Sequence, residues 1–172
     1  PGLGVISSLG HNSTEFWASL SRGASGIGPL ELVDRSQLRF QNGAEVRGYR
    51  AEDYFHEEQL SIYDRFTQFA MIAAQEAIVA SGIEWIPALR ERTAIVTGSA
   101  VGGQTTEDAA FADLYLHKKT RFHPLSIARV MANAPASHIS MEYGITGPAF
   151  TLSTACSSSN HAIGQAFWMV RD

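Results

Sequence analysis

The chain has 172 residues, a net charge of −4 at pH 7, 45% hydrophobic residues and 17% charged residues. This composition is typical of a globular protein that is long enough to bury a core. It provides no basic surface for nucleic acid, and no run of about eighteen apolar residues that would span a membrane. One cysteine excludes an internal disulfide framework and is typical of a protein of the reducing cytoplasm.

The N-terminal residues combine one short extended run with one helix. Residues 3–6 are expected to form the end of a strand. Asn12 or Ser13 is expected to cap a helix that ends at Gly23, because both residue types accept hydrogen bonds from free N–H groups at a helix start. The glycine- and proline-containing segment 24–29 is expected to be a loop.

A turn signal and a long helix follow. Within residues 38–46, the pair Asn42-Gly43 predicts a hairpin turn between two short extended runs. The acidic stretch 52–58 is expected to be exposed. A helix with an apolar face is expected from 61 to 80, with Gly82 as its C-terminal stop.

The rest of the chain alternates helices with short buried strands, which is typical of a layered α/β architecture. The expected elements are a strand at 93–97, helices at 105–116, 124–130 and 135–143, a strand at 150–153 and a helix at 158–170.

The single cysteine, Cys156, falls between the last strand and the last helix. Backbone N–H groups and the dipole at a helix N-terminus favour an anion, and therefore a thiolate, at that position. A thiolate in such a turn can act as a nucleophile that carries an acyl group. A lone cysteine is also commonly a buried, unreactive hydrophobe, so spacing alone leaves both roles open. His161 lies about 500° further round a helix, so it is expected to point away from Cys156 and to pack inside the helix layer.

Six segments together resemble one known family. They are 2–10, 97–103, 131–136, 144–148, 151–159 and 161–164. The last three resemble the nucleophile region of β-ketoacyl synthases, the condensing enzymes of fatty-acid and polyketide synthesis. The Thr-Ala-Cys-Ser-Ser segment around Cys156 is a specific motif of that region.

The resemblance implies an α/β, layered thiolase-like fold, with a mixed sheet packed between helices. Residues 1–172 would be the incomplete N-terminal half of one ketoacyl synthase domain. The family carries two catalytic histidines, a lysine and a second glycine-rich turn in its C-terminal half, and nothing here corresponds to His-Gly-Thr or Gly-Phe-Gly-Gly. The piece alone is therefore expected to expose an apolar face and to be inactive in condensation.

The resemblance also implies site residues and substrates. Cys156 would attack an acyl thioester and hold the acyl chain until a decarboxylated malonyl thioester attacks it. Val101 matches a position that lines the family's acyl pocket, although a plain packing role remains open. Leu125 and Ser126 match a place where some members carry paired aromatic residues that reach a partner subunit's pocket, although ordinary loop variation remains open. Neither a cofactor nor a metal ion is implied.

The implied partners are an acyl-carrier protein and a second copy of the chain in a homodimer. The acidic carrier protein usually docks on basic residues just before the position of Asp64. This chain has 57–62, beginning Glu-Glu, at that place, with only Arg65 nearby, so docking there is in doubt.

Two other classes of function fit a lone thiol. One is a non-catalytic dimerisation or scaffold module with a buried Cys156. The other is a cysteine-dependent hydrolase, which needs a histidine and an orienting Asn or Asp facing the thiol. Acylation by a thioester would separate the synthase from the scaffold module.

Overall fold

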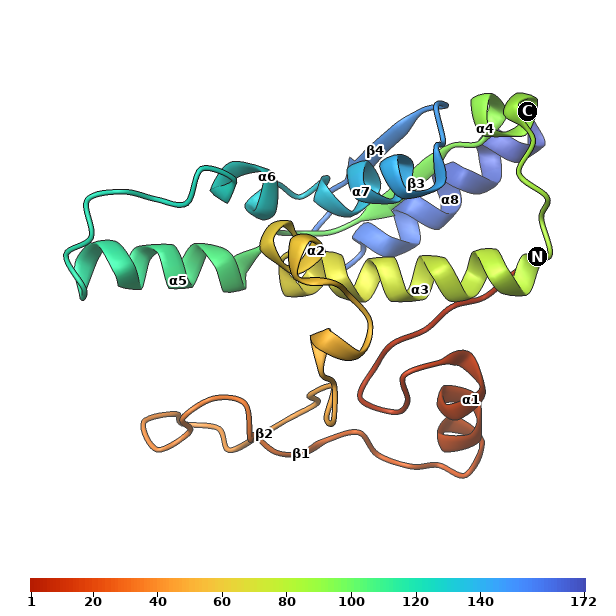
Figure 1. Cartoon of the computed structure of the whole chain (residues 1–172). Coiled ribbons are helices and arrows are strands. Elements are labelled where there is room, and N and C mark those ends of the chain that lie inside the picture. The colour runs from red at the N-terminus through yellow and green to blue at the C-terminus, as the bar shows by residue number, and fades with distance from the viewer. The chain divides into compact units, whose positions relative to one another are not determined.

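A computed structural model describes residues 1–172 (Figure 1). The chain forms two compact units. Unit 1 comprises 1–54 and 72–83, and unit 2 comprises 55–71 and 84–172. Helix α3 (Arg65–Ser81) contributes its first part to unit 2 and the remainder to unit 1.

Unit 1 contains, besides its part of α3, four short elements. They are α1 (Ser13–Ser21), β1 (Gly28–Pro29), β2 (Asn42–Gly43) and the 3-10 helix η1 (Ala51–Asp53). The side chain of Asn12 accepts a hydrogen bond of 2.9 Å from the N–H of Glu15, which confirms the expected start of the first helix.

The carboxylate of Glu76 on α3 ties two N-terminal segments of unit 1 together. It accepts hydrogen bonds from Val5 N at 2.8 Å, Ser13 N at 2.7 Å and Ser13 Oγ at 2.6 Å. Burial acts to raise the pKa of Glu76, but these hydrogen bonds outweigh it and hold the pKa below its ordinary value of 4.5. The ionised carboxylate is therefore the form that suits the fold.

The strand expected at residues 3–6 is wrong. This segment lies along α3 rather than beside another strand, and a Cβ on Gly4 would lie 1.8 Å from the carbonyl oxygen of Ala73. The absence of a side chain therefore lets the backbone of this segment lie directly against the helix.

The hairpin turn expected at Asn42-Gly43 is also wrong. These two residues form β2 itself, which pairs antiparallel with β1 so that Gly43 lies opposite Gly28. The connection between the two strands is the longer segment 30–41. Pairing with β1, which lies further away in the sequence, therefore determines the conformation of Asn42 and Gly43, rather than their local preference for a turn.

Unit 2 contains the larger set of elements. Besides its part of α3, they are α2 (Glu57–Ile62), α4 (Pro87–Arg92), β3 (Ile95–Gly98), α5 (Gln104–Tyr115), α6 (Ser126–Val130), α7 (Ala134–Tyr143), β4 (Ala149–Leu152) and α8 (Ser158–Arg171).

A parallel pair of strands organises this unit. Strands β3 and β4 run in register from Ile95 opposite Ala149 to Gly98 opposite Leu152. Parallel neighbours need a long crossover, which α5, α6 and α7 supply. Helices α7 and α8 both pack on the sheet (Figure 1). The layered α/β class is confirmed, and within this chain the parallel and antiparallel pairings lie in separate two-stranded sheets.

The long helix expected over 61–80 is α3, which begins at Arg65, later than expected, because residues 61 and 62 end the separate helix α2. The break lies at Tyr63 and Asp64, where Asp64 Oδ1 accepts a hydrogen bond of 3.2 Å from Phe66 N and so starts a new helix. Helix α4 is not among the predicted helices, although Pro87 at its first turn is a known start signal.

The core of unit 2 is small and lies around the parallel strands. Its buried apolar residues are Tyr63, Met71, Ile95, Ala134, Ala136, Ile139, Ile145 and Ala162. In contrast, α8 exposes Ile163 at 69%, Phe167 at 59% and Val170 at 90%. The expected exposed apolar face is therefore confirmed and lies on α8. None of the helices combines the length and the apolar character needed to cross a membrane.

Candidate active site

The candidate site lies where the two parallel strands end. Strand β3 is followed by the turn 99–103, called the glycine turn below, and β4 by the turn 153–157, called the cysteine turn. Because the carboxyl ends of parallel strands meet at the same edge of a sheet, the two turns are neighbours. Ser99 N donates to the carbonyl of Leu152 at 3.1 Å, and the hydroxyl of Ser159 donates to the carbonyl of Gly98 at 3.4 Å.

Cys156 lies in the cysteine turn, just before α8, and its thiol is exposed. The residue before it, Ala155, has a φ of +52°, a left-handed conformation that side chains with a Cβ rarely adopt. Such a conformation costs about 1–3 kcal/mol and persists only where neighbouring contacts enforce it. The chain thus turns sharply at the residue that presents the thiol.

Two serine hydroxyls hold this turn in place. The buried Ser158 Oγ donates to the carbonyl of Ala155 at 2.6 Å and accepts from Thr154 N at 2.9 Å. Ser157 Oγ donates to the carbonyl of Thr154 at 2.7 Å. Ser157 is the N-cap residue of α8 but makes no side-chain capping bond to it, so the capping preference of serine does not predict these contacts.

Gly98, at the end of β3, makes room for the start of α8. A Cβ on Gly98 would lie 2.4 Å from the carbonyl oxygen of Ser158 and 2.6 Å from the backbone nitrogen of Ser159. Both are backbone atoms that no side-chain rotation can move away. Glycine at this position therefore permits the close approach that joins the two turns.

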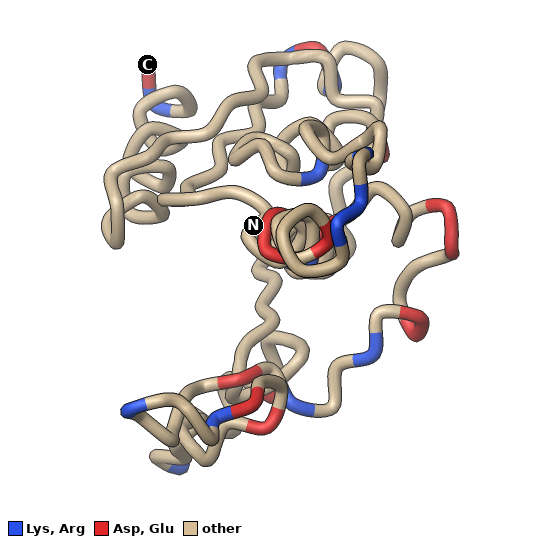
Figure 2. Tube along the Cα trace, turned by 90° about the vertical axis from the view of Figure 1, so that its left-hand side faces the viewer, with Lys and Arg blue, Asp and Glu red and all other residues tan.

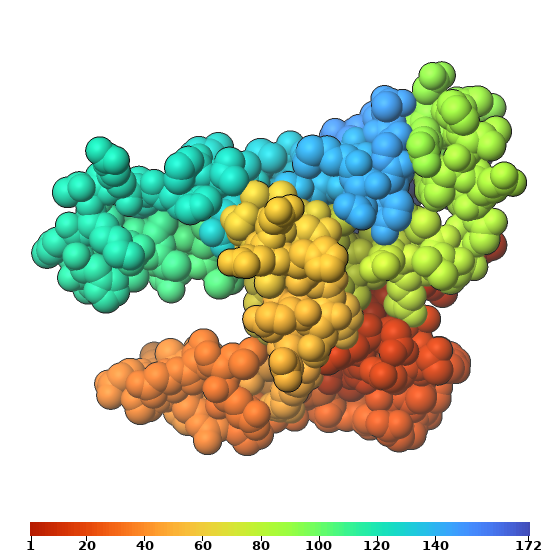
Figure 3. All heavy atoms as spheres, in the orientation of Figure 1, coloured from red at the N-terminus to blue at the C-terminus, as the bar shows by residue number.

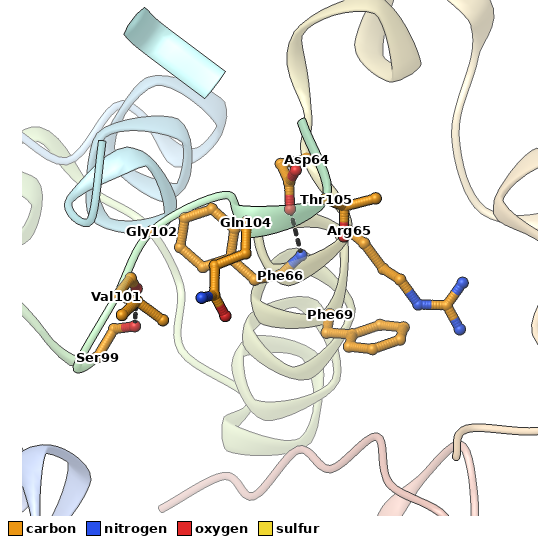
Figure 4. A pocket seen from close by; sticks show the side chains of 9 residues that line it. All are labelled: Asp64, Arg65, Phe66, Phe69, Ser99, Val101, Gly102, Gln104 and Thr105. Atoms are coloured by element: carbon orange, nitrogen blue, oxygen red, sulfur yellow. Dashed lines mark hydrogen bonds between the residues drawn. The ribbon is translucent and has the colours of Figure 1, made fainter. Parts of the chain in front are cut away.

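A pocket of about 250 Å³ lies beside the glycine turn (Figure 4). Its lining residues are Asp64, Arg65, Phe66, Phe69, Ser99, Val101, Gly102, Gln104 and Thr105. Val101 is 49% exposed, and the hydroxyl of Ser99 donates to its carbonyl. Leu125, 42% exposed just before α6, does not line this pocket. The structure therefore places Val101, but not Leu125, at this pocket.

Comparison with known proteins decides the family. The family model described as "Beta-ketoacyl synthase, N-terminal domain" matches residues 1–172. The chain belongs to the β-ketoacyl synthase family.

Individual relatives agree with this assignment. The 3-oxoacyl-[acyl-carrier-protein] synthase 2 of Coxiella burnetii is 31% identical over 169 residues, which are 98% of this chain and 41% of the relative. The solved structure of the ishigamide ketosynthase/chain length factor has a TM-score of 0.86 and 26% identity, covering 99% of this chain and 43% of that one. A ketosynthase solved with its type II polyketide synthase acyl-carrier protein has a TM-score of 0.75 and 18% identity, covering 99% of this chain and 45% of that one. The chain thus spans about two fifths of the length of the curated relatives it matches.

The segment just before Asp64 is acidic. Glu57 and Glu58 on α2 are exposed, and no lysine or arginine occurs between Ala51 and Asp64. Figure 2 colours the acidic and basic residues along the whole chain. Arg65 lies over the ring of Phe69, at 5.1 Å from the ring centroid. The acidic residues that the sequence places before Asp64 are therefore exposed in the folded chain.

Two remaining sequence expectations concern histidines and the region of Leu125. His161 is exposed on α8, so the prediction that it packs inside the helix layer is wrong. The next residue, Ala162, is buried instead, because successive residues of a helix point in directions about 100° apart. In the space-filling view, α5, α6 and the segment between them form one end of unit 2 (Figure 3). Leu125 is the last residue of that segment, directly before α6. No cluster of three or more His, Cys, Asp or Glu side chains is placed to hold a metal ion.

Proposed function

We propose that residues 1–172 are the N-terminal half of a ketoacyl synthase domain and that Cys156 is its acyl-carrying nucleophile. The observation that carries the proposal is the exposed thiol in a strained turn, held by Ser157 and Ser158 at the start of α8. A strained conformation of this kind is typical of functional turns. Family membership supplies the reaction class.

The proposed reaction is a decarboxylative Claisen condensation. The sulfur of Cys156 attacks the carbonyl of an acyl thioester, and the thiol of the donor leaves. A malonyl thioester then loses carbon dioxide, and the resulting carbanion attacks the carbonyl of the acyl-cysteine. A carbon–carbon bond forms, the carbon–sulfur bond to Cys156 breaks, and a β-ketoacyl thioester is released.

This half of the domain supplies part of that chemistry. The backbone N–H of Cys156 would be one donor to the oxyanion, and loss of one such donor typically costs about 10²–10³ in rate. In the family, the second donor and the histidines that assist decarboxylation come from the C-terminal half. We infer that residues 1–172 alone accept an acyl group but do not condense it.

The proposed partner is an acyl-carrier protein in the cytoplasm, in fatty-acid or polyketide synthesis. The relatives' name, 3-oxoacyl-[acyl-carrier-protein] synthase, supports a carrier-bound substrate. The carboxylates of Glu57 and Glu58 would repel an acidic carrier protein. Because complementary charge mainly accelerates and orients docking, the carrier protein is proposed to dock away from α2.

A homodimer is the expected state of the full-length protein. Strand β4 has β3 as its only strand neighbour in this chain, so its other edge is open to pairing. Pairing of β4 with its two-fold copy would cover that edge by an isologous contact. Light scattering of the full-length protein is expected to give twice the chain mass, and a monomer at micromolar concentration would contradict this state.

The reaction itself is tested by supplying the full-length protein with an acyl thioester and a malonyl thioester. The expected result is a β-ketoacyl product two carbons longer than the acyl donor, released with one equivalent of carbon dioxide. Hydrolysis of the acyl donor without product would instead indicate a cysteine hydrolase. An unmodified Cys156 after incubation with the acyl donor would indicate a scaffold module.

A further inference from the structure

Asp64 is a buried carboxylate that the proposed reaction does not use. Its exposed fraction is 3%, and it lies between α2 and α3 in unit 2. One oxygen accepts hydrogen bonds from Thr106 N at 2.7 Å and Thr106 Oγ1 at 2.6 Å. The other oxygen accepts from Phe66 N at 3.2 Å. A buried carboxylate therefore has defined hydrogen-bond partners on two helices.

These contacts make Asp64 a shared cap. Phe66 lies in the first turn of α3, and Thr106 lies in the first turn of α5. The N-cap residue of α5 is Gly103, which has no side chain to cap the helix. A carboxylate at two helix N-termini is favourable because it meets free N–H groups and the positive ends of both dipoles. Asp64 thus joins the start of α5 to the start of α3.

The glycine turn is held between this cap and other contacts. A Cβ on Gly103 would lie 2.9 Å from Cγ of Asp64 and 2.4 Å from the carbonyl oxygen of Arg129. Gly103 N also donates to the carbonyl of Val130 at 3.0 Å. At its other end, the turn is held by the bond from Ser99 N to Leu152. The position of Val101 between these ends is therefore set by both anchors.

We propose that Asp64 is a positioning residue which, through Thr106, sets where Val101 stands in the pocket and thereby which acyl chains Cys156 accepts. This inference rests on the proposed function and on the expectation that Val101 lines the pocket for the acyl chain. Asp64 and Val101 line the same pocket, so a shift of the turn changes its shape directly (Figure 4). Small changes in the shape of an apolar pocket change selectivity between chain lengths by about 10-fold or more.

The test compares acyl loading of Cys156 in the full-length protein and its variants. Butanoyl, octanoyl and dodecanoyl thioesters of N-acetylcysteamine are supplied separately, and the rate of adduct formation is followed by intact-protein mass. Thr106→Val removes one hydrogen bond to Asp64 at constant side-chain shape, and Asp64→Asn removes the charge. Both are expected to change the ratio of dodecanoyl to butanoyl loading by about 5-fold or more, as misplaced pocket residues do. Thr106→Ser keeps the hydroxyl and is expected to restore the wild-type ratio.

Two further measurements separate positioning from general loss of structure. Thr93→Val removes a comparable hydrogen bond, from Thr93 Oγ1 to the carbonyl of Leu89 at 2.7 Å, away from the pocket lining. It is expected to lower the melting temperature without changing the ratio. Labelling of Cys156 by iodoacetamide is expected to stay within about twofold in all variants, because the cysteine turn keeps its own hydrogen bonds.

The outcomes are distinct. An unchanged ratio in Thr106→Val, with wild-type loading intact, would overturn the proposal for Asp64 whether or not Asp64→Asn folds. A ratio that shifts equally in Thr93→Val would also overturn it, since the effect would then reflect stability alone. No acyl adduct on Cys156 in the wild-type protein would instead overturn the proposed function.

Discussion

Replacing Cys156 with serine is expected to abolish acyl loading. Residues 1–172 contain one cysteine, so no other thiol of this part of the protein can substitute for it. A serine hydroxyl is a far weaker nucleophile than a thiolate unless a base activates it. The rate of adduct formation from an acyl thioester should therefore fall by at least about 10³-fold, as it does when a covalent nucleophile is removed. Intact-protein mass after incubation with octanoyl-N-acetylcysteamine measures the effect.

The matched control is Asn160→Ala, a change at an exposed residue of α8 close to Cys156. This variant is expected to load at a rate within about twofold of the wild type, because surface substitutions outside specific contacts have small effects. An adduct that persists at the wild-type rate in Cys156→Ser would show that the acyl group resides elsewhere. The nucleophile assignment would then be wrong.

Replacing Gly98 with alanine is expected to lower both the stability of the protein and the rate of acyl loading, although Cys156 itself is unchanged. The new Cβ would lie 2.4 Å from the carbonyl oxygen of Ser158, so the end of β3 and the start of α8 must move apart. Overpacking of this kind typically costs about 1–3 kcal/mol of stability. Because the cysteine turn is joined to Ser158, a displacement of about 1 Å is expected to slow acyl loading by about 10²-fold.

Gly164→Ala on α8 is the control for Gly98→Ala. A Cβ at Gly164 would meet nothing within 4 Å in this chain, and alanine in a helix interior is about 1 kcal/mol more favourable than glycine. Thermal unfolding should therefore show Gly164→Ala as stable as the wild type or more so, and Gly98→Ala as less stable. Wild-type stability and loading in Gly98→Ala would show that the close approach is not required.

Helices and strands with strong local signals are predictable in this chain. Asn12 caps α1 as its residue type indicates, and Gly144 ends α7 with a φ of +60°. The run 93–97 predicts β3 to within about two residues, and the helix expected at 158–170 is α8. In these cases the residues that determine the element lie within it or next to it, so sequence alone suffices.

Two of the failed predictions share a physical cause. The Asn42-Gly43 signal indicates a turn, but these residues pair with Gly28 and Pro29 as a strand. Residues 3–6 have strand-like composition, but the segment lies on α3 and donates to Glu76. In both cases a partner distant in sequence supplies the backbone contacts, and local propensity does not contain that partner.

The position of Cys156 between a strand and a helix, and the family to which the chain belongs, are readable from residues 144–164 without a structure. Both can be read from the sequence because each depends only on residues that lie close together in the chain. The strained Ala155, the close approach at Gly98 and the cap that Asp64 supplies to Thr106 are not readable in this way. The strained Ala155 is held by Ser157 and Ser158 close by in the sequence, in a geometry that composition does not reveal. The other two features arise when β3 pairs with β4 and α5 begins beside Asp64, so that residues separated by 42 positions or more share hydrogen bonds. The sequence thus indicates the candidate nucleophile, whereas long-range packing brings its turn against the end of β3 and forms the pocket at the glycine turn.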